Sequence, residues 1–242
     1  MKAYVLHTVG SDRLVDGKIP TYPSCLPDYA IVESVTPKMG IRAPSKFVDT
    51  CVGTNQHLLD IGWCIYVSHY MGMLDQHSKH PDEDLLIMED DVVFEPKFDE
   101  YYSNFMKMVP DDWDVIYFGG TPRRYKPTEV VPNVLRPRII VGTECYMCRP
   151  KAVEHLLKRY ENLKSRVLEP SDVVVTRAFE HGDLNVYMPI IKFAHQYDNG
   201  YSIHSDRQVC LNTGRFRNFN YVGLDGQDHL NSDEDLHRYE DK

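Results

Sequence analysis

The segment of residues 85–94 constrains the fold of this chain more than any other part of its sequence. It begins with four apolar residues in a row, which is the pattern of a strand buried on both faces inside an α/β sheet. Three carboxylates, Glu89, Asp90 and Asp91, follow where that strand should end, and β-branched and aromatic residues come next. The pattern predicts a core strand that carries a dense negative charge at its carboxyl end.

This acidic triplet needs a positively charged partner if it lies beside the core. Like charges repel one another and are costly to remove from water. A divalent cation at the end of the strand would relieve both costs, and oxygen ligands suit Mg²⁺ or Mn²⁺. The alternative is a strand that runs into an acidic, solvated turn. Because core-like sequence flanks the triplet on both sides, we expect a metal or nucleotide site here.

Composition fits a compact cytoplasmic enzyme. The 242 residues suffice for one large α/β domain with a sizeable core. The net charge of −9 argues against a general nucleic-acid binder, which would carry a basic surface. The chain opens with strand-like sequence rather than a leader, and its apolar runs are far shorter than the roughly 18 residues of a membrane span. We therefore expect no nucleic-acid partner and no membrane span.

Strand-like and helix-like segments alternate along most of the chain. This alternation predicts an α/β fold with a mostly parallel central sheet and helices on both faces. The expected strands lie near residues 2–8, 29–35, 84–94, 114–119, 138–148 and 184–194. The expected helices cover about residues 55–79, 97–108, 150–164 and 171–181. We expect a single catalytic domain over residues 1–210 and a C-terminal extension with an acidic tail over residues 211–242.

The stretch from Gly119 to Pro137 interrupts this alternation. It holds two glycines, four prolines and four basic side chains. Long irregular loops in compact domains are often functional. We therefore expect an irregular lid in which residues 120–136 close over a bound ligand.

Other candidate site residues lie at strand ends, where open α/β sheets bind their ligands. The first strand ends in a polar turn with His7, Thr8 and Arg13, and an arginine can reach a phosphate. This turn has a single glycine, so it is neither a P-loop nor a dinucleotide fingerprint. His195 follows a late strand and is a candidate metal ligand, although a hydrogen-bonded surface histidine explains the pattern equally well.

Further motifs occur in a fixed order along the chain. They are Gly62, the pair Ser68 and His69, the acidic segment 86–92, the segments 113–119, 142–147 and 151–157, and the run Pro170, Ser171 and Asp172. Together they resemble glycosyltransferase family 25, the lipooligosaccharide and procollagen galactosyltransferase type. The likeness spans about residues 3–206. The sequence departs from the family pattern at Glu144 and Cys145, where a small residue or a histidine is usual.

The resemblance implies a GT-A fold, which is a nucleotide-sugar-binding α/β fold. It also implies that a hexose, galactose or glucose, moves with inversion from a UDP-sugar to an acceptor hydroxyl on a glycan or glycoprotein. A sugar diphosphate leaving group develops negative charge, which Mn²⁺ or Mg²⁺ between the phosphates would stabilise.

The same resemblance implies roles for the acidic triplet and its neighbours. Asp91 is the expected direct metal ligand, with Glu89 and His195 as further candidates. Glu89 or Asp90 would instead hold ribose hydroxyls or metal-bound water. His7, Thr8 and Arg13, in the turn after the first strand, complete the expected donor site.

Two more motifs of the resemblance carry expected roles. Asp172 would accept the proton of the attacking hydroxyl as general base, and its alternative is a helix cap, a position that aspartate favours. Ser68 and His69 either contact the donor or form a packing pair on their helix.

Three other functions stay open at this stage. A sugar-nucleotide pyrophosphorylase would share the architecture and the metal, but it would need a glycine-rich basic loop after the first strand. A metal-dependent phosphoesterase would need several separated Asp and His ligands. A non-catalytic nucleotide-sugar-binding module would need neither the triplet nor Asp172.

Overall fold

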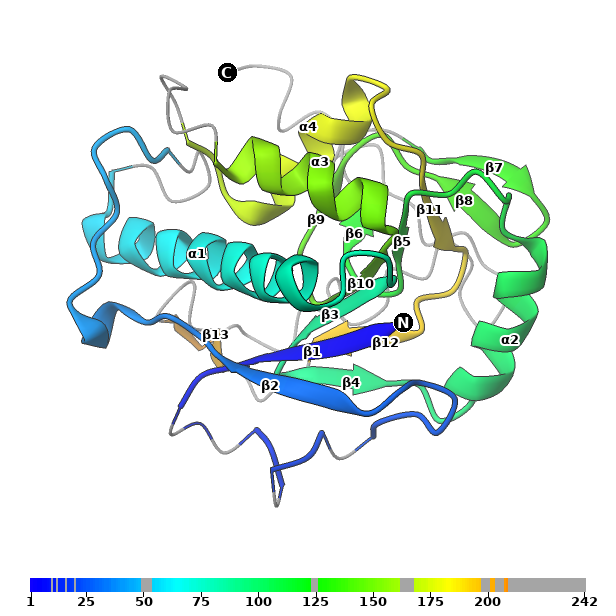
Figure 1. Ribbon diagram of the computed structural model, residues 1–242, viewed down its shortest axis with the longest axis horizontal. Coiled ribbons are helices and arrows are strands. Elements are labelled where there is room, and N and C mark those ends of the chain that lie inside the picture. The colour runs from blue at the N-terminus through cyan, green and yellow to red at the C-terminus, as the bar shows by residue number, and fades with distance from the viewer. Residues whose placement is uncertain are drawn as a thin grey trace.

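The computed structural model describes residues 1–9, 11, 13–15, 17–19, 21–48, 54–122, 126–161 and 168–196, and the backbone of two short strands after them. An eight-stranded sheet with the order β2-β1-β3-β10-β5-β11-β8-β7 forms its centre (Figure 1). The C-terminal extension expected over residues 211–242 lies outside the described residues.

The helices lie close to the predicted segments, whereas the strands are shorter and more numerous than predicted. The sheet consists of β1 (Lys2–His7), β2 (Tyr29–Glu33), β3 (Leu85–Glu89), β5 (Val115–Tyr117), β7 (Thr128–Val131), β8 (Val134–Arg136), β10 (Cys145–Cys148) and β11 (Val186–Pro189). Smaller ladders pair β4 (Val92–Phe94) with β12 (Ala194–Gln196), β6 (Thr121–Pro122) with β9 (Ile140–Val141), and β13 (Tyr201–Ser202) with β14 (Arg207–Gln208). The helices are the 3₁₀ turn η1 (Pro37–Met39), α1 (Gln56–Lys79), α2 (Phe98–Met108), α3 (Pro150–Tyr160) and α4 (Ser171–Glu180).

The central sheet is mostly parallel, as predicted. β1 runs parallel to both β2 and β3, and β5 runs parallel to β11. β10 is antiparallel to its neighbours β3 and β5, and β8 is antiparallel to β11 and β7. All strands of the sheet except β10 and β8 therefore point the same way.

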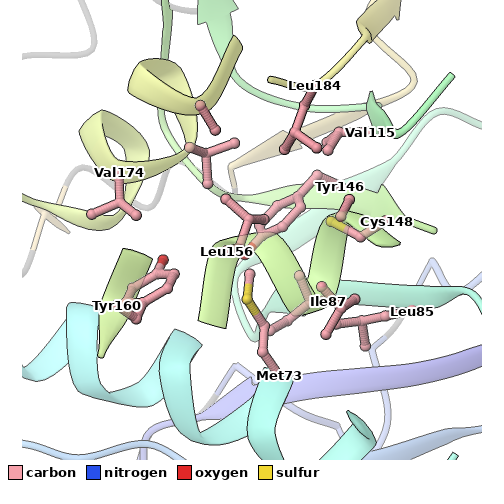
Figure 2. Close-up of a cluster of buried hydrophobic side chains, with 14 of the residues drawn as sticks. Met73, Leu85, Ile87, Val115, Tyr146, Cys148, Leu156, Tyr160, Val174 and Leu184 are labelled. Carbon is pink, nitrogen blue, oxygen red and sulfur yellow. The ribbon is translucent and has the colours of Figure 1, made fainter. Parts of the chain in front are cut away.

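Helices cover both faces of the sheet, which confirms the predicted α/β class. α1, α3 and α4 share one hydrophobic cluster with one face, and Figure 1 shows them grouped together. Figure 2 shows side chains of that cluster, with Met73 of α1, Ile87 of β3, Tyr146 of β10 and Leu156 of α3 close to one another. Phe98 and the rest of the buried stripe of α2 belong to the second cluster on the opposite face.

β3 is the core strand that the sequence predicts. Its first four residues are fully buried, and successive side chains enter the two clusters in turn. Burial of each large apolar side chain contributes about 1.5–3 kcal/mol. α1 packs closely against this strand at Gly72, where a Cβ atom would lie 3.0 Å from Ile87 Cδ1 and 3.2 Å from Leu6 Cδ2. β3 and α1 therefore form a closely packed base for the residues that follow Met88.

The segment predicted as an irregular lid is largely β-structure. β7 and β8 form a hairpin that extends the sheet beyond β11. Its turn has Pro132 followed by Asn133 with φ of 68°, and a proline followed by a left-handed residue is typical of a type II turn. The prediction of irregular structure is wrong for residues 128–136, because β7 and β8 are paired within the central sheet. Closure of this segment over a ligand stays a prediction.

Three long predicted strands are shorter than expected. The chain turns at Asp90 and Asp91 and continues as β4, while the segments near 138–148 and 184–194 each divide into two strands. One part of each segment lies outside the central sheet, and these parts are β4, β9 and β12. None of the helices within the described ranges is long and apolar enough to cross a membrane.

Candidate active site

The predicted site residues gather at one edge of the central sheet. The carboxyl ends of β1, β3 and β5 meet there because these strands point the same way. The amino end of β10 lies at the same edge because β10 is antiparallel to β3. The edge therefore brings together Glu89 at the end of β3, the residues after β1, and Glu144 just before β10.

Asp90 fastens the loop after β1 to the end of β3. Its Oδ2 lies 2.8 Å from His7 Nδ1 and accepts hydrogen bonds from the Thr8 amide at 2.9 Å and the Ser11 hydroxyl at 3.0 Å. Its Oδ1 accepts a hydrogen bond from Arg13 at 2.8 Å. Both oxygens thus have partners, and only 3% of the residue is exposed. This geometry makes Asp90 an anchor of the loop rather than an open ligand for a nucleotide.

Arg13 links two members of the triplet. The same guanidinium nitrogen that bonds Asp90 lies 3.4 Å from Asp91 Oδ2, and Asp91 is 4% exposed. Burial alone would lower the pKa of Arg13, but the Asp91 and Asp90 carboxylates, with a smaller effect of Glu89, hold that pKa above its ordinary value. Arg13 therefore remains charged and lies against the negative end of β3.

The Glu89 carboxylate contacts a buried histidine and a threonine hydroxyl. Glu89 Oε1 accepts a hydrogen bond from Thr143 Oγ1 at 2.7 Å, and His69 Nε2 lies 3.4 Å from the same oxygen. His69 Nδ1 is 2.9 Å from the hydroxyl of Tyr146, and the histidine is completely buried. His69 thus orients Glu89 from inside the protein.

Ser68 has a structural position on α1. Its hydroxyl donates a hydrogen bond to the Cys64 carbonyl at 2.8 Å and accepts one from the Val35 amide at 2.9 Å. Ser68 therefore ties α1 to the segment that follows β2. The burial of Ser68 and His69 agrees with the packing interpretation of this pair.

Asp172 lies in the first turn of α4, where the N-cap residue is Pro170. Asp172 Oδ1 accepts a hydrogen bond from the Val173 amide at 2.8 Å, and Oδ2 accepts one from the Gly142 amide at 3.3 Å. The second contact joins α4 to the loop before β10. Asp172 is therefore close to the sheet edge that carries the candidate site, as well as part of the helix terminus.

The Glu144 carboxylate also lies close to Gly142. Its Oε2 is buried and has no hydrogen-bond partner in the described part of the chain. Burial raises the pKa of Glu144, and the positive charge of Lys192 opposes this shift. Lys192 is 7% exposed and donates a hydrogen bond from Nζ to Thr121 Oγ1 at 3.0 Å.

Lys192 is a residue of this site that the sequence patterns above do not predict. The signal that could have found it is a lone lysine inside an otherwise apolar run, between Ile191 and Phe193. A lysine is almost never fully buried unless it is paired, so its burial indicates neighbouring acidic groups. Here the neighbouring acidic group is Glu144.

His195 lies against the side chain of Glu95, the residue that follows β4. Its Nε2 is 2.7 Å from Glu95 Oε1, across the ladder of β12 and β4. Burial lowers the pKa of His195, helped by Lys192 and opposed by Glu95. Across the described ranges, no three His, Cys, Asp or Glu side chains form a group that could hold a metal ion. His204, which follows in the sequence, lies outside those ranges.

The carboxylates at the end of β3 fit a cation that shares its ligands with a substrate. Mg²⁺ at phosphate sites is usually held by one or two carboxylates, and phosphate oxygens and waters supply the remaining ligands. Asp91 and Glu89 are carboxylates of this kind, whereas both oxygens of Asp90 are engaged by the loop after β1.

Gly142 makes room for the Glu144 carboxylate, which leads to a stability prediction. Its φ is 92°, and a Cβ atom would lie 2.5 Å from Glu144 Oε2. At Gly182, φ is 77° and a Cβ atom would have no other atom within 4 Å. We expect Gly182→Ala to cost about 1–2 kcal/mol through backbone strain. We expect Gly142→Ala to cost about 1 kcal/mol more, because the carboxylate end of the Glu144 side chain must move away from the new methyl group. Urea unfolding of both variants measures the difference, and equal losses would contradict the close contact.

Comparisons with known proteins add solved structures of distant similarity to the fold described above. No family model matches the chain, and no curated protein matches it, so membership of family 25 stays a prediction. A197 from STIV is similar in structure, with a TM-score of 0.38 and 14% identity over 78% of this chain and 81% of that chain.

Two other solved structures are similar over smaller parts. UDP-glucose pyrophosphorylase in complex with UDP-glucose has a TM-score of 0.33 and 8% identity over 66% of this chain and 57% of that chain. Mouse xyloside xylosyltransferase 1 in its apo form has a TM-score of 0.30 and 12% identity over 60% of this chain and 54% of that chain. The chain thus spans little more than half the length of these two proteins. These scores are too low to support a functional assignment.

Proposed function

We propose that the chain is a metal-dependent, inverting glycosyltransferase with a GT-A fold. It would move a hexose, galactose or glucose, from a UDP-sugar to an acceptor hydroxyl on a glycan or glycoprotein. One observation carries this proposal: the same sheet edge presents one carboxylate group at the end of β3 and another around Gly142. The first comprises Glu89 and Asp91, and the second comprises Glu144 and Asp172. The order of the sequence motifs, which resembles family 25, supports the same function.

The two carboxylate groups suit the two charge changes of glycosyl transfer. The leaving nucleoside diphosphate gains negative charge, and the acceptor hydroxyl loses a proton as it attacks the sugar. In a single displacement the base and the leaving group lie on opposite sides of the sugar. One carboxylate group at the end of β3 and another around Gly142 can serve these two tasks.

The donor side would be the end of β3. Asp91 would hold Mn²⁺ or Mg²⁺ directly and Glu89 would hold it directly or through water, with the diphosphate completing the coordination. When bound, the cation would supply charge stabilisation for the leaving diphosphate. The contact of Glu89 with Thr143 and His69 would fix the orientation of its carboxylate before the donor arrives.

The acceptor side would be the loop before β10 and the start of α4. Asp172 would take the proton of the attacking hydroxyl, and the Gly142 amide would keep its carboxylate at the sheet edge. A carboxylate that is already hydrogen-bonded is preorganised and needs little reorientation during the reaction. Lys192 and Glu144 would set the local charge beside it.

A panel of nucleotide sugars, incubated with Mn²⁺ and simple glycosides, tests this function. We expect release of a nucleoside diphosphate that depends on one sugar donor and increases when an acceptor is present. A pyrophosphorylase would instead release sugar 1-phosphate when pyrophosphate is supplied, and a binding module would bind a donor without turnover. Product formation from phosphate esters without any sugar donor would indicate a phosphoesterase.

A further inference from the structure

Among the described residues, Arg13 is a cationic side chain that lies against two members of the acidic triplet. Arg13 lies 2.8 Å from Asp90 Oδ1 and 3.4 Å from Asp91 Oδ2, and the charge of Glu89 also acts on it. Only 15% of the Arg13 side chain is exposed, and the Asp90 and Asp91 side chains are almost completely buried. The guanidinium therefore provides the positive charge that a divalent cation would otherwise provide at this position.

Arg13 and a divalent cation would compete for Asp91. Two unit charges a few ångströms apart interact strongly where water is largely excluded. A cation that binds Asp91 would repel the guanidinium that already lies beside the same carboxylate. A nucleoside diphosphate brings additional negative charge, and arginine binds phosphate oxygens with good geometry.

Residues other than Arg13 also join the segment after β1 to Asp90. The Thr8 amide, the Ser11 hydroxyl and the His7 ring contact Asp90 Oδ2, whereas Arg13 contacts Asp90 Oδ1. The Arg13 side chain can therefore turn away from the triplet while the loop remains fastened to the end of β3.

We propose that Arg13 is a counter-ion that compensates the acidic triplet in the absence of donor and moves to the donor diphosphate when the cation binds Asp91. The inference rests on the proposed function, because it assumes a diphosphate ligand. It goes beyond that function because it makes cation and nucleotide binding mutually dependent. Arg13 weakens the binding of the cation alone and strengthens the binding of the diphosphate, so each ligand favours the other.

Removal of the Arg13 charge should strengthen, rather than weaken, the binding of Mn²⁺ alone. We expect Arg13→Met to bind Mn²⁺ alone at least about tenfold more tightly than the wild type, because a repelling charge has gone. The same variant should bind UDP more weakly at saturating Mn²⁺, because it lacks the diphosphate contact. Isothermal titration with MnCl₂ alone, and then with UDP at saturating Mn²⁺, measures both affinities in the full-length chain.

A second ion pair of the chain provides the matched control. Arg42 Nη1 lies 2.8 Å from Asp60 Oδ2, and Asp60 is a buried carboxylate of α1 rather than a member of the triplet. Arg42→Met removes the same charge by the same substitution and should leave the affinity for Mn²⁺ unchanged. If Arg13→Met does not fold, Arg13→Gln removes the charge but retains a hydrogen-bond donor for Asp90.

The outcomes separate this inference from the proposed function. An unchanged or weaker affinity for Mn²⁺ in the folded Arg13 variant would overturn it, as would an equal gain in Arg42→Met. Absence of Mn²⁺ binding in both the wild type and the variant would also overturn it. The titration with MnCl₂ involves no donor sugar, so a failure of glycosyl transfer would contradict the proposed function and leave the competition between Arg13 and the cation intact.

Discussion

Asp91→Ala should reduce glycosyl transfer by at least about 10²–10³-fold, the loss typical when one electrostatic stabiliser of a transition state is removed. The same variant should lose the Mn²⁺-dependent part of its affinity for nucleoside diphosphate. The physical reason is that Asp91 would be the direct link between the end of β3 and the cation. Turnover with the preferred donor and UDP titrations with and without Mn²⁺ measure the two effects.

The fold should survive this substitution. Asp91 is buried, but its removal also removes a like charge beside Asp90 and Glu89, and Arg13 retains its bond to Asp90. Asp82→Ala is a suitable control, because it makes the same change at an exposed residue before the amino end of β3. The control should keep both turnover and the effect of Mn²⁺. An unchanged Mn²⁺-dependent affinity for UDP in Asp91→Ala would refute the metal assignment.

Much of the secondary structure that carries this site can be predicted from residues that are neighbours in the sequence. The apolar run before Glu89 predicts β3 because a strand buried on both faces needs no alternation. The long helix α1 begins at a recognisable cap, where the Asn55 side chain accepts a hydrogen bond from the Leu58 amide. Pro150 likewise marks the first turn of α3. These signals depend on neighbouring residues, so one sequence suffices to read them.

What the sequence could not predict depends on contacts between distant segments. The prolines and basic residues of segment 119–137 favour a lid by composition, whereas pairing with β11 decides the structure of the β7–β8 hairpin within it. The contacts of Asp90 with residues after β1 bridge about eighty positions of sequence, as its bond to Thr8 does with a separation of 82. Burial of Lys192 depends on Thr121 and Glu144 in the same way. The pattern of neighbouring residues does not show which distant residues will contact one another.

Asp172→Asn should lower the turnover number by about 10²–10⁴-fold, the usual contribution of a general base. The amide oxygen of asparagine can still accept the hydrogen bond from the Gly142 amide, so α4 and the loop before β10 should keep their positions. UDP affinity and the melting temperature should therefore stay close to those of the wild type. A residue that serves only at the helix terminus would instead show a loss of about 1 kcal/mol in unfolding free energy with normal turnover.

A second aspartate separates these two roles of Asp172. Asp99 occupies the same position in α2, the second residue of the helix, on the opposite face of the sheet. Asp99→Asn makes the same chemical change at a helix terminus and should leave turnover unaffected. If Asp172→Asn behaves like this control, the candidate base becomes Glu144, which also lies close to Gly142. Glu144→Gln should then lower the turnover number. The anomeric configuration of the product, measured by NMR, completes the test, because a single displacement requires inversion whichever carboxylate accepts the proton.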